Sequence, residues 1–370
     1  MKNKVLVWGN GKSAYTVANY IRTEFADSMD FVGFYVSDYQ YKNNAGDEPV
    51  YVMSEVISDS NEIADALIIP NPGKKISDIL LEHRKLKNKK ILFVSAENIR
   101  CPNKVNYFRA IDQNKPWLNG FEYHVVDHCN LNCKGCGHCA NLFSQPSYGD
   151  IATYERDLKR LSELFDGIGL IRLLGGEPLL SSNLERYIEI TREYFKYAEV
   201  HIVTNGILIP SKEKDFLQFL KKNGVIVDIS VYPPVENKML LITETLKNSE
   251  VEYNVMPVEQ FYKRFSLNRR FDKDEAFINC GTATCHTLYY GKIAPCIVPF
   301  STDKLNRAFN INIPIDGWID LFEDGVDGDS INARLKQPFE LCSHCNPEKC
   351  FFNWEQRRFE DCKLDDWICD

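Results

Sequence analysis

The sequence lacks any apolar run long enough to cross a membrane. A spanning helix needs roughly 18 consecutive apolar residues, and none occurs in the 370 residues. The opening stretch, MKNKVLVWGNG, has too short an apolar part for a signal peptide and is typical of a buried strand that enters a turn. We therefore expect a cytoplasmic protein with no membrane partner.

The chain also lacks an excess of positive charge. Its 44 Lys and Arg residues face 52 Asp and Glu residues, which gives a formal net charge of −8. Nucleic-acid binders usually carry a basic face, so we expect no nucleic-acid partner. Hydrophobic residues at 44% and charged residues at 26% are those of a globular protein, and the length predicts two or three domains.

Cysteine is nearly absent from the first third of the chain and concentrated afterwards. Of the 13 cysteines, only Cys101 precedes residue 129, four lie in residues 129–139 and eight follow from residue 280. A reducing compartment disfavours structural disulfides, so this clustering favours metal binding or catalysis.

Alternating strand and helix patterns predict an α/β fold. Residues 1–112 read as a Rossmann-like doubly wound sheet, because the β-branched runs at 4–8, 31–36, 64–70 and 90–96 alternate with helical stretches. A linker is expected at 113–120. Residues 121–275 repeat the alternation, with strands near 121–127, 170–175, 199–205, 225–232 and 251–257, as in an open sheet or a partial barrel. Ligands of either gather at the carboxyl ends of the strands. Residues 276–370 form a small cysteine-rich extension that we expect to depend on a metal.

The segment DHCNLNCKGCGHC, residues 127–139, follows the first strand of the middle part. Reading Cys133, Cys136 and Cys139 as a ferredoxin loop fails, because position 143 is Phe where a fourth cysteine is needed. A closed zinc site that uses these three thiols with His128 or His138 stays open as an alternative. The spacing C-x3-C-x2-C of Cys129, Cys133 and Cys136 instead suits three ligands of a four-iron cluster, which leaves one iron open.

This spacing after a first strand resembles the radical S-adenosylmethionine (SAM) enzymes. Three later segments are similar to the same family, and each stands at the end of a predicted strand: the GGEP segment, the TNG segment and the polar end of the fourth strand. Read singly, each of them is an ordinary turn. Their residues are Gly175, Gly176, Glu177, Pro178, Thr204, Asn205 and Ser230.

The resemblance implies a partial (β/α)6 radical SAM barrel and two cofactors. Cys129, Cys133 and Cys136 would hold a [4Fe-4S] cluster whose open iron chelates SAM, while the glycine-rich and polar strand ends would contact SAM. A reducing partner such as flavodoxin or ferredoxin is implied as well. One position departs from the family: an aromatic residue usually precedes the third cysteine, but here it is Gly135.

The late cysteines resemble the SPASM and twitch extensions, which bind auxiliary iron-sulfur clusters. The full SPASM pattern fails, because Cys350 comes one residue early and position 354 is Trp. The one-cluster twitch form fits better and implies a second [4Fe-4S] cluster on Cys296, Cys342 and Cys345, with either Cys280 or Cys285 as the fourth ligand. A structural zinc site built from the same thiols stays open.

Near the amino terminus, Gly9, Gly11 and Ala14 form G-x-G-x-x-A between a strand and a helix, and Asp38 ends the next strand. These are the parts of a dinucleotide-binding turn, in which backbone amides meet phosphate and an acidic side chain meets ribose. The stretch also resembles Rossmann-like domains of sugar-modifying enzymes. A turn that only packs a strand against a helix and binds no ligand explains the pattern nearly as well. If the turn does bind a ligand, we expect a nucleotide sugar rather than NAD.

Three functions follow from these readings. The first is a radical SAM enzyme that oxidises, epimerises or deoxygenates a small-molecule substrate, a nucleotide-linked sugar, in surface-polysaccharide biosynthesis, because the layout resembles radical SAM proteins encoded among polysaccharide genes. The second is a SPASM-type maturase of peptides or proteins. The third is a non-catalytic protein whose metals only stabilise its fold.

Overall fold

The computed structural model describes residues 2–37, 48–58, 63–71, 73, 76–84, 86 and 89–370. The chain divides into two compact units. The first comprises Met1–Asn119 with Leu164–Gly169 and Tyr197–Glu199, and the second comprises Gly120–Glu163, Leu170–Lys196 and Val200–Asp370. None of the helices in the described ranges is long and apolar enough to span a bilayer.

The first unit is built on a six-stranded sheet in the order β3-β2-β1-β4-β5-β6. The first five strands are parallel and β6 is antiparallel to β5. Its strands are β1 (Asn3–Trp8), β2 (Met29–Val36), β3 (Val50–Val52), β4 (Ala66–Pro70), β5 (Lys90–Val94) and β6 (Arg109–Ala110), and its helices are α1 (Lys12–Glu24), α2 (Met53–Ser58), α3 (Ile76–His83) and α4 (Ala96–Arg100).

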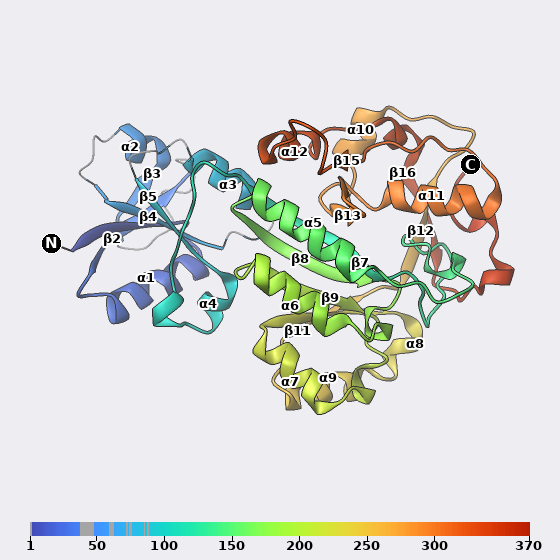
Figure 1. Cartoon of the computed structure of the whole chain (residues 1–370), viewed down its shortest axis with the longest axis horizontal. Helices are drawn as coiled ribbons and strands as arrows, with labels where there is room; N and C mark the ends of the chain where they lie inside the picture. The colour runs from blue at the N-terminus through green and yellow to red at the C-terminus, as the bar shows by residue number, and fades with distance from the viewer. Residues whose placement is uncertain are drawn as a thin grey trace. The chain divides into compact units, whose positions relative to one another are not determined.

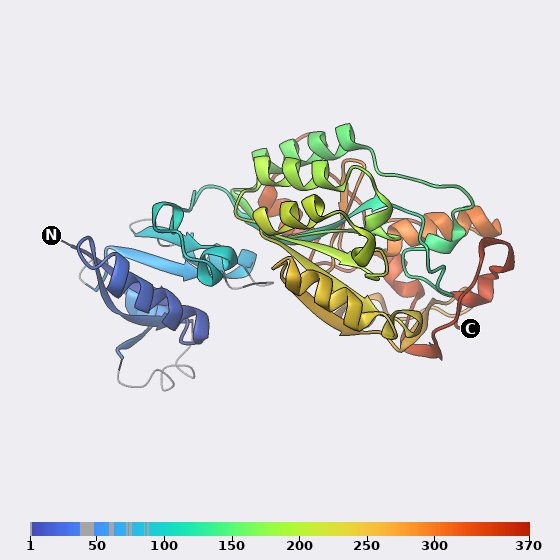
Figure 2. The same cartoon turned by 90° about the horizontal axis from the view of Figure 1, so that it is seen from below.

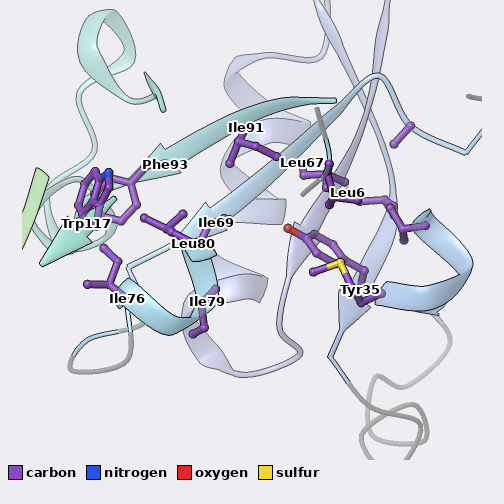
Figure 3. Close-up of a cluster of buried hydrophobic side chains, with 14 residues drawn as sticks. Leu6, Tyr35, Leu67, Ile69, Ile76, Ile79, Leu80, Ile91, Phe93 and Trp117 are labelled. Atoms are coloured by element: carbon purple, nitrogen blue, oxygen red, sulfur yellow. The ribbon is translucent and has the colours of Figure 1, made fainter. Parts of the chain in front are cut away.

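Side chains from both faces of this sheet are buried. On one face Leu6, Tyr35 and Phe93 pack with Trp117 and with Ile76 of α3 (Figure 3). Val5, Phe34 and Val17 of α1 belong to the core of the other face. Strands buried on both faces are expected of a parallel sheet covered by helices.

The second unit contains an eight-stranded sheet in the order β11-β10-β9-β8-β7-β13-β14-β15 (Figures 1 and 2). Within it, β9, β10 and β11 are paired in parallel, β13 is parallel to β7, and β14 and β15 are antiparallel. The strands are β7 (Trp117–Val126), β8 (Gly167–Gly175), β9 (Glu199–Thr204), β10 (Val225–Val231), β11 (Tyr253–Pro257), β13 (Thr287–Tyr289), β14 (Lys292–Ala294) and β15 (Ile319–Asp320).

Helices follow these strands and cover one face of the sheet (Figure 2). They are α5 (Ile151–Leu164), α6 (Leu184–Tyr194), α7 (Lys214–Lys222), α8 (Pro233–Glu236) and α9 (Met239–Asn248). In α5, Tyr154, Leu158 and Leu161 are fully buried, and their spacing of four and three residues places them on one side of the helix. The periodicity of the sequence thus fixes which side of α5 faces the sheet.

The carboxyl-terminal part adds a two-stranded antiparallel sheet of β12 (Gln260–Phe265) and β16 (Cys345–Asn353). Three helices accompany it: α10 (Lys273–Ile278), α11 (Val298–Phe309) and α12 (Gly328–Arg334). We expected 121–275 and 276–370 to be separate, but β13 pairs with β7, and both parts lie in one compact unit. Trp117–Gly120, expected in the linker, are part of β7.

Candidate functional site

The cysteine loop, residues 129–141, follows β7 directly. Cys129, Cys133 and Cys136 line one cavity that encloses about 550 Å³ of space, part of it open to solvent. The ends of β8, β9 and β10 complete its wall. The other lining residues are Leu131, His138, Ala140, Leu174, Gly175, Gly176, Val203, Thr204, Asn205, Ser230, Tyr232 and Phe261. The structure therefore gathers the sequence-predicted residues of four separate segments around one cavity.

Cys133 is buried, Cys129 and Cys136 are partly buried, and the three thiols are electrically neutral without a bound cation. Burial raises the pKa of Cys129 to about 12, and it also raises the pKa values of Cys133 and Cys136. Iron would reverse this preference, because a coordinating thiol is deprotonated. Among the described residues, no three Cys, His, Asp or Glu side chains are already arranged around a metal position. The three thiols line one cavity, and three cysteines suit the ligands of an iron-sulfur cluster.

Two glycines let β8 end close against the start of the cysteine loop. Gly175 has a φ of +135°, and a Cβ placed on it would lie 1.8 Å from the Val126 carbonyl oxygen. A Cβ on Gly176 would lie 2.0 Å from the carbonyl oxygen of His128. Only glycine can occupy both positions without displacing backbone. The GGEP segment is thus a close backbone approach at the wall of the cavity.

Glu177 is fully buried and, like Pro178, does not line the cavity. Its carboxylate accepts hydrogen bonds from the Thr204 hydroxyl at 2.6 Å, from the Asn205 backbone N–H at 2.9 Å and from the Leu179 backbone N–H at 3.0 Å. Sequence reasoning placed Glu177 and Pro178 in contact with the cofactor. In the structure, Glu177 accepts hydrogen bonds from Thr204 and Asn205, which line the cavity, and its own contact with the cofactor stays a prediction.

Asn205 connects β9 to the cysteine loop. Its side-chain amide donates to the Asn130 side-chain oxygen at 2.8 Å, while its own side-chain oxygen accepts from the backbone N–H of Ile207 at 3.0 Å. The Ser230 side chain lies near the Tyr232 hydroxyl, whose pKa burial raises. These polar strand ends are therefore held in fixed positions around the thiols.

Sequence reasoning missed two aromatic residues of the cavity wall, Tyr232 and Phe261. Their rings contact each other in a tilted arrangement, with a centroid distance of 5.8 Å. Tyr232 stands two residues after Ser230, so strand alternation could have placed it on the same face. Phe261 lies in β12, and no local signal connects it with this site.

His138 lines the cavity, whereas Cys139 does not. The Nδ1 atom of His138 lies 2.8 Å from Nε2 of His124, and Nδ1 of His124 lies 3.0 Å from the Asp127 carboxylate. Cys139 is fully buried in the core of the carboxyl-terminal part, and its thiol faces the Ser301 carbonyl oxygen at 3.8 Å.

The late cysteines fall into two groups. Cys280, Cys296, Cys342 and Cys345 are close enough to affect one another's ionisation, and burial raises the pKa of Cys345 to about 12 and that of Cys342 to about 11. Cys285 lies next to the Glu122 carboxyl, whose pKa it acts to lower against the effect of burial. Of the two alternatives for a fourth ligand, the structure places Cys280 with the others.

Cys350 and Cys369 lie side by side, with Cα atoms 6.1 Å apart. Lys263 is the register partner of Cys350 across β12 and β16, and the backbone N–H of Cys369 donates to the carbonyl oxygen of Phe265 at 2.7 Å. The structure thus brings the last part of the chain next to the two-stranded sheet.

In the first unit, the G-x-G-x-x-A turn lies between β1 and α1. Gly9 has a φ of +85°, and nothing lies within 4 Å of the Cβ positions of Gly9 or Gly11, while Ala14 is buried. The strand order reverses between β1 and β4, where open α/β sheets bind ligands. Asp38 lies outside the described residues.

Residues 123–236 match the Radical SAM superfamily. The middle of this chain is a radical SAM domain. The match includes Cys129, Cys133, Cys136, the GGEP and TNG segments and Ser230, so the resemblance is confirmed at the level of the superfamily.

Curated relatives match over a similar region. The GTP 3',8-cyclase of Campylobacter jejuni subsp. doylei is 32% identical over 115 residues, which cover 31% of this chain and 35% of the cyclase. Molybdenum cofactor biosynthesis protein 1 of Dictyostelium discoideum is 34% identical over 125 residues, 33% of this chain and 19% of that protein. The chain spans at most about two fifths of the length of these curated relatives.

Solved structures show weaker similarity. BtrN in complex with AdoMet and 2-DOIA is 19% identical with a TM-score of 0.40, over 62% of this chain and 93% of BtrN. Native anSMEcpe with bound AdoMet is 20% identical with a TM-score of 0.33, over 39% of this chain and 45% of anSMEcpe. Similarity at this level carries no argument about substrate.

Proposed function

We propose that this protein is a radical SAM enzyme that acts on a sugar, in particular a nucleotide-linked sugar, in surface-polysaccharide biosynthesis. The observation that carries the proposal is the single cavity lined by Cys129, Cys133 and Cys136 together with the ends of three neighbouring strands. A metal site that only stabilises the fold needs the thiols alone. It does not explain why polar residues at the strand ends line the same cavity.

Reductive cleavage of SAM at a [4Fe-4S] cluster on these thiols would supply a 5'-deoxyadenosyl radical that abstracts hydrogen from the substrate. The residues of the chain hold and orient the reactants. Gly175 and Gly176 leave backbone room beside the thiols, and Thr204, Asn205 and Ser230 present polar atoms to a ligand in the cavity. Leu174, Val203 and Phe261 are apolar parts of the same wall that limit the access of water.

A polar inner face favours a small hydrophilic substrate. Arg172 in β8, His201 in β9 and Asp228 in β10 each come two residues before a residue that lines the cavity. Because side chains alternate along a strand, these three lie on the same face of the sheet as the lining residues. His201 Nδ1 lies 2.6 Å from the Asp228 carboxylate, which also accepts from the Asn254 side chain at 2.8 Å. Arg172 donates to Glu122 at 3.2 Å. Such alternating donors and acceptors suit hydroxyl groups better than the apolar side chains of a peptide.

The first unit supports the nucleotide-linked form of the substrate. Its glycine turn stands at the reversal of strand order, and backbone at Gly9 and Gly11 is open to a ligand. We propose that this turn binds the diphosphate of a nucleotide sugar. Gly9, Gly11 and Ala14 form the turn, and Asp38 is proposed as the partner of the ribose.

We further propose an auxiliary [4Fe-4S] cluster on Cys280, Cys296, Cys342 and Cys345. The side chain of Arg264 favours negative charge there: its guanidinium donates to the Thr282 hydroxyl at 3.0 Å, and that hydroxyl lies 3.3 Å from Cys280 Sγ. A four-thiolate cluster carries net negative charge, which this cation offsets. A zinc ion on the same thiols is the competing assignment.

The decisive experiment measures 5'-deoxyadenosine formed by anaerobically reconstituted, reduced protein, with and without a panel of nucleotide sugars. The proposal expects slow formation without substrate and a clear rise with one sugar. A rise with peptides instead would establish the maturase alternative, and binding of SAM without cleavage would favour a non-catalytic protein.

Cysteine variants assign the chemistry to this cavity. Cys129→Ala should abolish formation of 5'-deoxyadenosine, because the open-iron arrangement needs all three thiols. Cys139→Ala is the matched control in the same loop, since its thiol lies outside the cavity, and it should retain the activity. Equal activity of the two variants would refute the ligand assignment.

A further inference from the structure

The carboxyl-terminal segment, residues 352–367, runs along the cysteine loop (Figures 1 and 2). The backbone N–H of Lys134 donates to the Glu355 carbonyl oxygen at 2.8 Å, and the backbone N–H of Arg357 donates to the Asn132 carbonyl oxygen at 2.6 Å. Both hydrogen bonds join backbone groups, so they hold the cysteine loop against the carboxyl-terminal segment without the help of side chains.

Gly135 shows how closely the two segments approach. Its φ is +61°, and a Cβ on it would lie 2.7 Å from the Asp366 carbonyl oxygen and 2.7 Å from the Phe352 ring. The family places an aromatic side chain at this position of the loop. Here the carboxyl-terminal segment occupies that space, and the Phe352 ring lies 6.1 Å, between centroids, from the cavity residue Phe261.

Within this contact, one side chain reaches a cysteine sulfur. The indole N–H of Trp354 donates to Sγ of Cys133 at 3.1 Å, across 221 residues of sequence. Cys133 is buried, and tryptophan Nε1 is a donor under all conditions. The indole can therefore donate to this sulfur whether it is a thiol or a metal-bound thiolate. A second indole, that of Trp367, donates to the Cys136 carbonyl oxygen at 2.9 Å.

We propose that Trp354 is a positioning residue that raises the reduction potential of the cluster held by Cys129, Cys133 and Cys136. The inference rests on the proposed function, because it needs that cluster to form. Reduction adds one electron, supplied by a low-potential donor, and so adds negative charge to the cluster and its sulfurs. A hydrogen bond to a ligand sulfur stabilises the more negative state, and such bonds are among the determinants of iron-sulfur potentials. The carboxyl-terminal segment thereby controls how easily the cluster is reduced.

The test is a redox titration of the full chain, reconstituted with iron and sulfide, in wild type and in Trp354→Phe. Phenylalanine keeps an aromatic ring and removes the N–H. Dithionite with mediators sets the potential, and the electron paramagnetic resonance signal that changes on adding SAM reports the cluster of the cysteine loop. At a fixed potential we expect the ratio of reduced to oxidised cluster to fall about threefold or more in the variant, equivalent to ~30 mV because a tenfold change is about 59 mV for one electron.

Trp318→Phe is the matched control, since Trp318 stacks on Tyr289 and not on the cysteine loop; it should leave the ratio unchanged. An unchanged ratio in Trp354→Phe overturns the inference. If Trp354→Phe holds no cluster, Trp354→His, which keeps a ring N–H, should hold it at a potential near that of wild type, and failure there also overturns it. A wild-type protein with no SAM-responsive signal would refute the proposed function itself, a distinct result.

Discussion

The Glu177 carboxylate accepts a hydrogen bond from the Thr204 hydroxyl at 2.6 Å and so ties the end of β8 to the end of β9. The two residues belong to different motifs, GGEP and TNG, 27 positions apart in the sequence. The bond explains why both motifs are needed for one wall of the cavity. Glu177 is fully buried. If its carboxylate were removed, no water could take its place as the acceptor for the three groups that donate to it.

Replacing Glu177 should therefore destabilise the second unit. In Glu177→Ala, the Thr204 hydroxyl and the backbone N–H groups of Asn205 and Leu179 lose their acceptor. A buried unsatisfied donor costs about 1–3 kcal/mol, and we expect the free energy of unfolding to fall by about 3 kcal/mol. Glu185→Ala, on the surface of the adjacent helix, should change it by less than ~0.5 kcal/mol. Denaturant titration measures both, and equal stabilities would contradict this role of Glu177.

Gly176→Ala should displace the cysteine loop. The added methyl group would lie 2.0 Å from the His128 carbonyl oxygen, and backbone on either side must move to relieve the overlap. We expect a loss of about 2 kcal/mol or more in stability together with loss of SAM binding. Gly137→Ala is the control, because nothing lies within 4 Å of its Cβ position. Calorimetry of SAM binding and thermal unfolding test the pair, and SAM affinity retained in Gly176→Ala would show that the loop adapts.

The elements of the two large sheets and the cysteine loop could be predicted from the sequence. Runs such as VIVDISV and EVHIVT signal buried strands by their β-branched residues, and each predicted site motif follows such a run. Since carboxyl ends of parallel strands meet at one edge of a sheet, Thr204 and Ser230 could be placed near the cysteines without coordinates. Two short apolar runs flank YGK at residues 290–292 and predict a hairpin there, which the antiparallel pairing of β13 with β14 confirms.

Contacts between distant segments could not be predicted. The bond between Trp354 and Cys133 depends on how β12 and β16 pair, and no local pattern specifies that register. Likewise, Cys280 and Cys285 are only five positions apart, and spacing alone cannot tell which of the two thiols lies near Cys345. The buried hydrogen bonds that Glu177 accepts from Thr204 and Asn205 also join distant segments, and the contact of Glu177 with a cofactor stays a prediction.

The two candidate ligands of the auxiliary cluster should behave differently. Cys280→Ala removes a thiol of the group that includes Cys296, Cys342 and Cys345, and we expect it to lose about four irons per chain, as should the double variant Cys342→Ala/Cys345→Ala. Cys285→Ala removes a thiol that lies next to the Glu122 carboxyl and should keep the iron. Iron analysis and the spectrum of the remaining cluster check this. Loss of iron in Cys285→Ala alone would reverse the assignment, and zinc in place of iron in the wild type would refute the cluster.

Gly11→Val tests whether the first unit binds a nucleotide sugar or contains only a packing turn. Nothing lies within 4 Å of the Gly11 Cβ position, and its φ is −92°, which valine adopts readily. The variant should therefore fold with a thermal midpoint close to that of wild type. A branched side chain at this point would keep a diphosphate from approaching the backbone amides, so affinity for UDP-glucose or GDP-mannose should fall at least about tenfold, or ~1.4 kcal/mol. Equilibrium dialysis of wild type, Gly11→Ala and Gly11→Val should give a graded loss. Equal binding in all three would assign the turn to packing and move the recognition of the sugar to the radical SAM cavity alone.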